Sequence, residues 1–295
     1  MSRRSPVAVF LLALPLPTTP ALADGCPLPG QWLHAGEAVD TAELMAELAA
    51  REIVLLGEQH ERPAHHRWQL HTLAGLHAHQ PDMAIGLEML PREAQPALDA
   101  WVAGELDEAG FLEASDWQSA WGLDPDLYLP ILHFARMQRI PLVALNVAPE
   151  LRRRLSAEDW ESIPAGARHG ITPPAPASAA YRETLEEAYA HHPDPVADGL
   201  ERFIAAQLVW DRAMAQGLAE ATPDAELVVG LMGQGHLTYG HGVPHQLDDL
   251  AIPDHRVLLP WPAEQACPPP EDIADALFVL ESPAEWTSRR LAPTP

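Results

Sequence analysis

Two stretches of this sequence end in the same way, and they constrain the fold more than any other feature. Each is a run of apolar residues that leads into Gly-x-x-His, with the histidine at His60 in the first and His236 in the second. Two further apolar runs between them end on a polar side chain, at Glu88 and Asn146. Short apolar runs of this kind are typical of strands buried in a parallel sheet. Four such runs, separated by helix-length segments, predict an α/β fold.

The rest of the chain extends this alternation of strands and helices. We predict strands over 52–57, 83–89, 141–145, 226–231, 256–259 and 276–280. We predict helices over about 41–50, 64–79, 91–102, 128–139, 179–190 and 196–220, with irregular structure over 149–177. Thr41 is the expected N-cap of the first helix, and Pro91 is expected to open the third. The pattern favours a mostly parallel sheet with helices on both faces.

Length and hydrophobic content fit one large domain. The chain has 295 residues, of which 47% are hydrophobic, enough for a sizeable core. We therefore predict a single α/β domain over 24–295. Helical insertions at about 91–139 and 178–220 are expected to lie over the carboxyl edge of the sheet.

The first 23 residues have the pattern of an export signal. Two arginines precede an apolar stretch over 7–16, and Ala21-Leu22-Ala23 resembles a cleavage site. This predicts a signal peptide over 1–23 and a periplasmic protein. The alternative is a lipoprotein anchored at the outer membrane through Cys26, although the aspartate at Asp24 fits a lipobox poorly.

The two cysteines and the overall charge add two further expectations. Cys26 and Cys267 are the only cysteines, and an even count in an oxidising compartment favours a disulfide between them. The formal net charge is -24, and all 18 basic residues are arginines. An acidic surface repels nucleic acid and anionic lipid, so we expect no nucleic-acid partner and no membrane contact beyond a lipid anchor.

The polar side chains after the strands suggest one site. Ligands of open α/β sheets bind where the carboxyl ends of parallel strands meet, so Glu58, His60, Glu88 and His236 are expected to converge. Two imidazoles and two carboxylates would suit a hydrolase, either metal-dependent or using acid–base catalysis on water. No HExxH-type pair fixes a metal geometry, and we assign no metal ligands. The alternative is a buried polar network that holds the strand ends together.

Six segments, taken in order and spacing, resemble the ChaN-like haem-binding uptake family of the TIKI/TraB/erythromycin-esterase superfamily. They are LGEQHE at 56–61, PAHH at 63–66, LEMLPR at 87–92, ALN at 144–146, AQLVWD at 206–211 and GQGHLTYGHGVP at 233–244. The resemblance runs from about residue 32 to 280. It implies an exported bacterial protein, often a lipoprotein, associated with haem or iron acquisition. The superfamily also includes hydrolases, among them an esterase branch whose motif histidine acts in catalysis.

Haem requires a flat apolar pocket and an axial donor. The expected cofactor-binding residues lie in the later helical hairpin and the loop after His236, in the order Tyr181, Tyr189, Tyr239, His191 and His192. The expected apolar wall is formed by Phe203, Leu208, Trp210 and Met214, and the arginines expected to hold the propionates are Arg182 and Arg202. Ordinary core packing is the alternative for each aromatic residue.

The sequence therefore leaves three functions open. The first is an exported haem-binding protein of bacterial haem and iron uptake, which could act as a homodimer. The second is a hydrolase that uses the strand-edge residues. The third is a structural or partner-binding protein whose crevice is vestigial.

Overall fold

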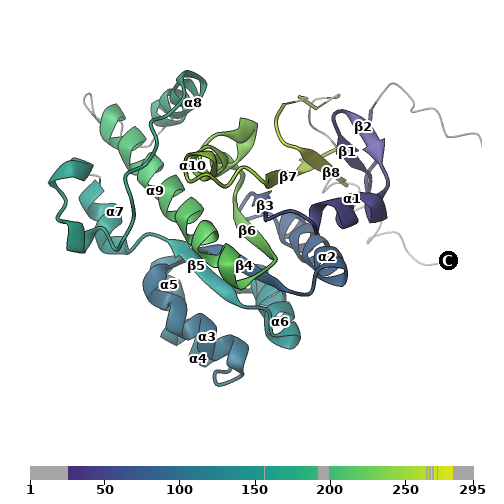
Figure 1. The fold of residues 1–295 in the computed structure, drawn as a ribbon, viewed down its shortest axis with the longest axis horizontal. Helices are drawn as coiled ribbons and strands as arrows, with labels where there is room; N and C mark the ends of the chain where they lie inside the picture. The colour runs from purple at the N-terminus through teal and green to yellow at the C-terminus, as the bar shows by residue number, and fades with distance from the viewer. Residues whose placement is uncertain are drawn as a thin grey trace, which may run out of the picture.

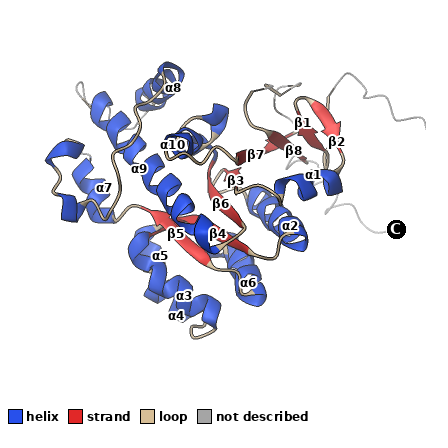
Figure 2. Cartoon of the chain, in the orientation of Figure 1, coloured by secondary structure: helices blue, strands red, loops and turns tan. Residues whose placement is uncertain are grey.

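The computed structural model describes residues 26–155, 157–191, 199–263, 265, 267, 269–270 and 272–281. The predicted signal peptide and His192 lie outside the described residues. The described chain forms one eight-stranded sheet with helices packed on it (Figures 1 and 2). The strands are β1 (Trp32–His34), β2 (Glu37–Val39), β3 (Ile53–Glu58), β4 (Met83–Pro91), β5 (Leu142–Asn146), β6 (Leu227–Gly233), β7 (His255–Pro262) and β8 (Ala276–Leu280).

The six predicted strands are present and run parallel, which confirms the α/β fold class. The order across the sheet is β2-β1-β8-β7-β3-β6-β4-β5, so β6 lies between β3 and β4. All residues of β3, β4 and β6 are buried. Burial on both faces explains why these strands appear in the sequence as continuous apolar runs and not as alternating patterns.

The hairpin of β1 and β2 was not predicted from the sequence. It pairs antiparallel with β8 and lies at the edge of the sheet. Its turn places Ala35 and Gly36 at positive φ. Strands of three residues are too short to show a hydrophobic period, so the pattern carries no signal for them.

The helices correspond to the predicted segments with three corrections, except that α10 was not predicted. They are α1 (Thr41–Leu48), α2 (Pro63–His79), α3 (Gln95–Ala103), α4 (Glu108–Ala114), α5 (Trp117–Ala120), α6 (Leu129–Gln138), α7 (Pro149–Leu155), α8 (Ala179–Ala190), α9 (Leu200–Ala221) and α10 (Val243–Asp249). Asp40, not Thr41, caps α1, because its carboxylate accepts from two backbone N–H groups of the first turn. Pro91 ends β4 opposite Asn146 and is the residue before a 3-10 helix (Arg92–Ala94) that leads into α3, so it is not itself the first helical residue. The segment expected to be irregular contains α7.

Two hydrophobic clusters fill the two faces of the sheet. One contains buried side chains of α1, α2, α3 and α6, including Trp68 and Trp101. The other contains side chains of α9 and α10, including Met214 and Leu247. The prediction of helices on both faces is therefore confirmed.

The second helical insertion, at 178–220, and the segment before it form two small cores with α9. Leu151 and Trp160 pack with Val209 of α9, and Tyr181 and Leu185 of α8 pack with Ile204 of α9. Figure 1 shows α7 and α8 beside the first half of α9, away from the strands. The long helix α9 thus joins this lobe to the sheet.

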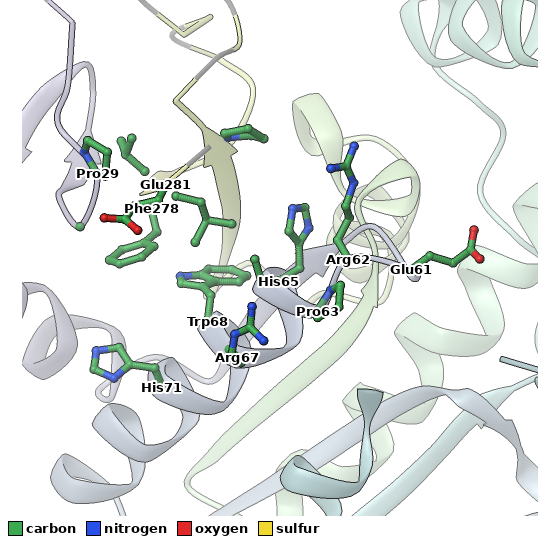
Figure 3. Close-up of a pocket in the computed structure, with 15 residues that line it drawn as sticks. Pro29, Glu61, Arg62, Pro63, His65, Arg67, Trp68, His71, Phe278 and Glu281 are labelled. Atoms are coloured by element: carbon green, nitrogen blue, oxygen red, sulfur yellow. The ribbon is translucent and has the colours of Figure 1, made fainter. Parts of the chain in front are cut away.

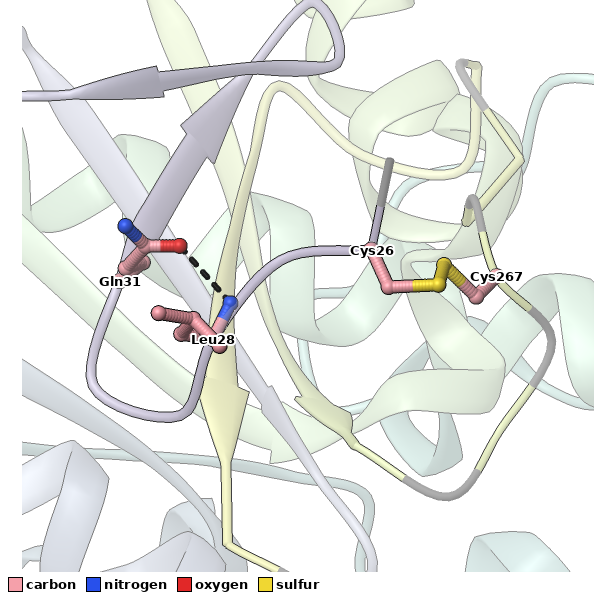
Figure 4. Close-up of a disulfide and its surroundings, with 4 residues drawn as sticks. All are labelled: Cys26, Leu28, Gln31 and Cys267. Atoms are coloured by element: carbon pink, nitrogen blue, oxygen red, sulfur yellow. Dashed lines mark hydrogen bonds between the residues drawn. A yellow bond between two sulfur atoms is a disulfide. The ribbon is translucent and has the colours of Figure 1, made fainter. Parts of the chain in front are cut away.

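The N-terminal end of the described chain is linked to the segment between β7 and β8 by a disulfide between Cys26 and Cys267, with Cα atoms 5.6 Å apart (Figure 4). This is the predicted pair, and the separation is normal for a bridge. Among the described helices, none has both the length and the apolar composition needed to cross a bilayer.

Candidate functional site

The carboxyl edge of the sheet brings together the four residues expected to share a crevice. Glu58 ends β3, Glu88 lies near the end of β4, and His236 follows β6, which runs between them. His60 follows Glu58 by two residues, and its ring lies against the end of β6. The topology itself produces this meeting, because neighbouring parallel strands end at one edge.

Glu58 and His60 form the first half of the site. Glu58 is buried, and its Oε1 accepts hydrogen bonds from His60 Nδ1 at 2.8 Å and from the Tyr128 hydroxyl at 3.2 Å. The side chain of His60 is 37% exposed and packs edge-on against Trp121. Because Nδ1 donates to Glu58, the neutral ring carries its lone pair on Nε2. His60 is thus a partly accessible base that a buried carboxylate orients.

The pKa of His60 is raised above its ordinary value. Burial is the largest single effect and lowers the pKa, as does the charge of His236, but the hydrogen bond to Glu58 and the negative charges of Glu88 and Glu58 outweigh them. The buried ring of His66 supports the same turn, because its Nε2 donates to the backbone carbonyl of His60 at 2.8 Å.

Glu88 and His236 form the second half. Glu88 Oε2 accepts from the backbone N–H of Gly233 at 2.6 Å, and Oε1 lies 3.4 Å from His236 Nε2. His236 Nδ1 donates to Asp211 Oδ1 at 2.6 Å, and the Tyr181 hydroxyl donates to Asp211 Oδ2 at 2.7 Å. The result is a buried chain of four side chains, of which His236 is the central cation.

The charges of this buried chain stabilise each other. Burial lowers the pKa of His236, but Glu88 and Asp211 overcome it and raise the pKa to about 10. Burial likewise opposes ionisation of Glu88, yet His236 keeps the pKa of Glu88 below its ordinary value. An imidazolium between two carboxylates is therefore the state expected at neutral pH.

Two glycines make room for this arrangement. A Cβ on Gly233 would lie 2.9 Å from His60 Cε1, so the close approach of the His60 ring to β6 requires glycine. Gly242 has φ +64°, and a Cβ there would lie 2.5 Å from the carbonyl oxygen of His236.

Several residues of the site were not assigned a role from the sequence. Asp211 is fully buried on α9, Tyr128 and His66 contact Glu58, and Trp121 covers His60. Asp211 lies in one of the six motif segments, but only tertiary contacts reveal its partners. A charged residue inside the apolar face of a helix was the available signal.

The side chains of this site are suited to acid–base chemistry. His60 can take or give a proton at Nε2, while the His236 cation holds positive charge beside it. Across the described ranges, no group of three or more His, Cys, Asp or Glu side chains has a geometry that would hold a metal ion.

Two of the four tyrosines are committed to buried carboxylates. Tyr181, ranked first as a haem donor, is 2% exposed and donates to Asp211. Tyr128 is 1% exposed and donates to Glu58. Burial, followed by the charge of the neighbouring carboxylate, raises the pKa of each phenol. Neither hydroxyl is placed to become a phenolate ligand in this structure.

The other two tyrosines lie nearer the surface. Tyr189 is half-buried on α8, with its ring 5.3 Å from that of Phe203 on α9. Tyr239 is 49% exposed, with φ 61°, in the turn after His236. His191, at the end of α8, is exposed, and its Nδ1 donates to the carbonyl of Glu187.

The remaining predicted haem contacts are dispersed. Leu208 and Met214 are buried in two different cores, so they do not form one open wall. Arg182 forms ion pairs with Glu186 and Glu201, whereas Arg202 is exposed on the first turn of α9.

Comparisons with known proteins agree on the fold. The sequence profile described as "Haem-binding uptake, Tiki superfamily, ChaN" matches residues 44–247. Among solved structures, ChaN of Campylobacter jejuni, described with cofacial heme binding, is similar with a TM-score of 0.67 and 16% identity, covering 84% of this chain and 95% of that one. A search of curated proteins gives no significant match.

Two further solved structures are more distant. The type III effector HopBA1 has a TM-score of 0.47 and 13% identity, covering 81% of this chain and 92% of that one. The erythromycin esterase EreC in its open conformation has a TM-score of 0.47 and 16% identity, covering 79% of this chain and 77% of that one.

Proposed function

Since the chain belongs to the ChaN family of haem-binding uptake proteins in the Tiki superfamily, we propose that it binds haem and takes part in bacterial haem or iron uptake. The similarity to Campylobacter jejuni ChaN, a protein described with cofacial heme binding, supports the proposal. A bound haem would supply an iron centre, and the protein's task is to hold it.

The observation that carries the proposal is that the four tyrosines form two groups, two bonded to buried carboxylates and two nearer the surface. The hydroxyls of Tyr181 and Tyr128 donate to buried carboxylates, so we rank Tyr189 and Tyr239, which lie nearer the surface, above them as phenol donors to ferric iron. Tyrosine is an established axial ligand of haem iron. The donor set of the chain therefore fits the cofactor at two positions.

Of these two positions, Tyr189 suits haem better. Its ring packs beside Phe203, an apolar neighbour, and the exposed Arg202 lies next to Phe203 on α9. Tyr239 borders a cavity that is lined by three aspartates, Asp248, Asp272 and Asp275, against one arginine, Arg256, so the net charge there is unfavourable for propionates. We therefore assign the iron to Tyr189, with Arg202 as a propionate partner.

A half-exposed donor also supports a homodimer. Cofacial haems stack on one another, and a donor at the surface lets the haem of one chain meet the haem of a second. We propose that haem binding and pairing of two chains occur together. Sedimentation of the protein with and without hemin tests this, and a monomer at saturating hemin would rule it out.

Titration with hemin tests the binding proposal. The wild type should show a saturable Soret shift and a high-spin ferric spectrum, as expected for phenolate ligation. Tyr189→Phe should lose the high-spin charge-transfer band and bind about tenfold or more weakly, since it loses one iron ligand but keeps the ring.

Tyr239→Phe is the matched control and should titrate like the parent. If the wild type gives no saturable shift, haem binding is wrong. If both phenylalanine variants bind like the parent, haem binding stands and tyrosine ligation is wrong, so His191 and His192 should be replaced next.

We also propose that the protein is exported and works in the periplasm. The Cys26–Cys267 bridge supports an oxidising compartment. Anchoring through Cys26 would require its sulfur for a thioether, so the bridge and the lipid anchor exclude each other. Mass spectrometry of non-reduced peptides from cell fractions tests both: a Cys26–Cys267 peptide in the periplasm is expected, whereas diacylated Cys26 would restore the anchor.

A hydrolase remains the second candidate, because one observation favours it. His60 is a partly exposed base that Glu58 orients, an arrangement that suits activation of water. Hydrolysis of a p-nitrophenyl ester by the wild type, lost in His60→Asn and retained in Tyr189→Phe, would support it. Equal rates for wild type and His60→Asn would exclude it for that ester.

A further inference from the structure

A large cavity lies beside the strand-edge site and contains none of its four acid–base residues. Its volume is about 920 Å³, and it lies between the first half of α2 and the ends of β7 and β8 (Figure 3). Small-molecule sites fall in the range of about 300–1,000 Å³, so this cavity could accept a large ligand.

One side of the cavity is apolar and aromatic. Trp68 of α2 and Phe278 of β8 line it together with Leu280, and Figure 3 shows the two rings side by side. Trp32 packs behind them, 5.1 Å from the ring of Phe278 and 6.0 Å from that of Trp68. A rigid aromatic wall of this kind favours a flat or extended apolar body.

The other side of the cavity carries positive charge. Arg62 and Arg67 are exposed at its rim, and both belong to the beginning of α2. This helix has no side-chain N-cap and no acidic residue in its first turn, so its positive end is not neutralised. Of the two acids that line the cavity, Glu61 points away from the aromatic wall, and Glu281 lies near Phe278 (Figure 3).

From these features we propose that the cavity binds a large amphipathic carboxylate. Its apolar body would lie on Trp68 and Phe278, and its carboxylate would lie at Arg62, Arg67 and the N-terminus of α2. Two kinds of molecule share this chemistry, a porphyrin with propionate groups and a long-chain fatty acid. In an acidic chain of net charge -24, cations gathered beside an apolar cavity provide the complementarity that an anion needs.

The experiment uses iron-free protoporphyrin IX and palmitate as separate probes. Both lack iron, so neither depends on a tyrosine ligand, and Tyr189→Phe should bind them like the parent. Saturable binding of one probe by calorimetry identifies the source of the carboxylate. If neither probe binds, the proposal is wrong, whatever hemin does.

Two variants test the place of binding. Ala64→Trp adds bulk at the cavity wall without removing a core side chain, and it should abolish binding; Ala114→Trp, on the exposed face of α4, should not. Unchanged binding by a folded Ala64→Trp protein would place the ligand elsewhere and overturn the proposal.

Charge recognition is tested by removing either partner of the contact. Arg62→Ala with Arg67→Ala should weaken binding about three- to tenfold, the range for two exposed ion pairs, while Arg152→Ala on α7 should not. Methyl palmitate or the dimethyl ester of protoporphyrin should bind to the wild type about as weakly as the free acid binds to the double arginine variant. Esters that bind as well as the acids would show that no carboxylate is recognised.

Discussion

At the scale of single residues, the strand-edge site places its buried carboxylates beside imidazole rings. Glu88 and Asp211 are buried, and each has the same imidazolium as a partner. Breaking one contact of such a network leaves a buried charge uncompensated, which costs more than an exposed pair would. The pKa of His236 is therefore the most direct measure of this part of the site.

Replacing Asp211 with Asn should lower the pKa of His236. The amide keeps the size of the side chain but removes one of the two negative charges that raise this pKa to about 10. A fall of about one unit or more is expected, and NMR titration of the His236 ring measures it. Tyr181→Phe removes the other hydrogen bond to Asp211 without removing charge, so its effect should be much smaller. An unchanged pKa in Asp211→Asn would contradict the network.

The same ionisations predict how stability depends on pH. The folded pKa of His236 lies above its unfolded value of 6.5. Its stabilising contribution to the free energy of unfolding is therefore complete below pH 6.5 and is lost as the pH rises toward 10. The folded pKa of Glu88 is lowered, so its contribution is present above its ordinary value and is lost as the pH falls through the folded value. The difference in melting temperature between the wild type and His236→Gln should narrow from pH 6.5 to 10. A constant difference would argue against a buried imidazolium.

At the scale of secondary-structure elements, α2 does more than connect two strands. It packs Trp68 and Leu73 into the core, and its first turns supply His65 and His66 to the loop after β3. His65 Nδ1 accepts from the backbone N–H of Gln59, and burial lowers the pKa of His65 to about 4. A neutral His65 thus fixes the turn that carries His60.

The start of α1 gives a test at this scale. Asp40→Ala should lower the free energy of unfolding by about 1 kcal/mol, because its carboxylate satisfies two backbone N–H groups of the helix. Thr41→Ala is the matched control, and its effect should be within a few tenths of a kcal/mol since Thr41 is the first helical residue. Urea unfolding measures both. The reverse order would restore the cap that the sequence pattern suggested.

At the scale of the whole molecule, the disulfide joins two segments that are 241 residues apart. The N-terminal segment is otherwise held to β8 by backbone hydrogen bonds of Gly30 and Gln31 with Val279. A bridge that closes so long a loop restricts the unfolded chain strongly. Pro29 and Gly30, which line the large cavity, follow Cys26 closely in the sequence.

Replacing Cys26 and Cys267 together with Ser should lower the free energy of unfolding by about 2–5 kcal/mol. Denaturant unfolding of the oxidised wild type and the double variant measures the difference. Adding a reductant should bring the wild type to the level of the variant and leave the variant unchanged. Equal stability of the oxidised wild type and the variant would mean that the bridge does not form in solution.

The sequence by itself determined the parallel strands, most helices and the meeting of four polar residues at one edge. It could do so because buried strands are continuous apolar runs, and because the carboxyl ends of parallel strands share an edge. The positions of Glu58, Glu88 and His236 followed from these local patterns alone. The pairing of Cys26 with Cys267 followed from their number.

Only the tertiary structure decided which polar residues are partners and which donors are accessible. Asp211 and Tyr181 lie on different helices, and their hydrogen bond to each other removed the first-ranked haem ligand from consideration. The hairpin of β1 and β2 and the cavity at α2 depend on segments distant in sequence. A one-dimensional pattern records the period of burial along the chain. It does not record which side chains from different elements contact each other, because those contacts are set by packing between the elements.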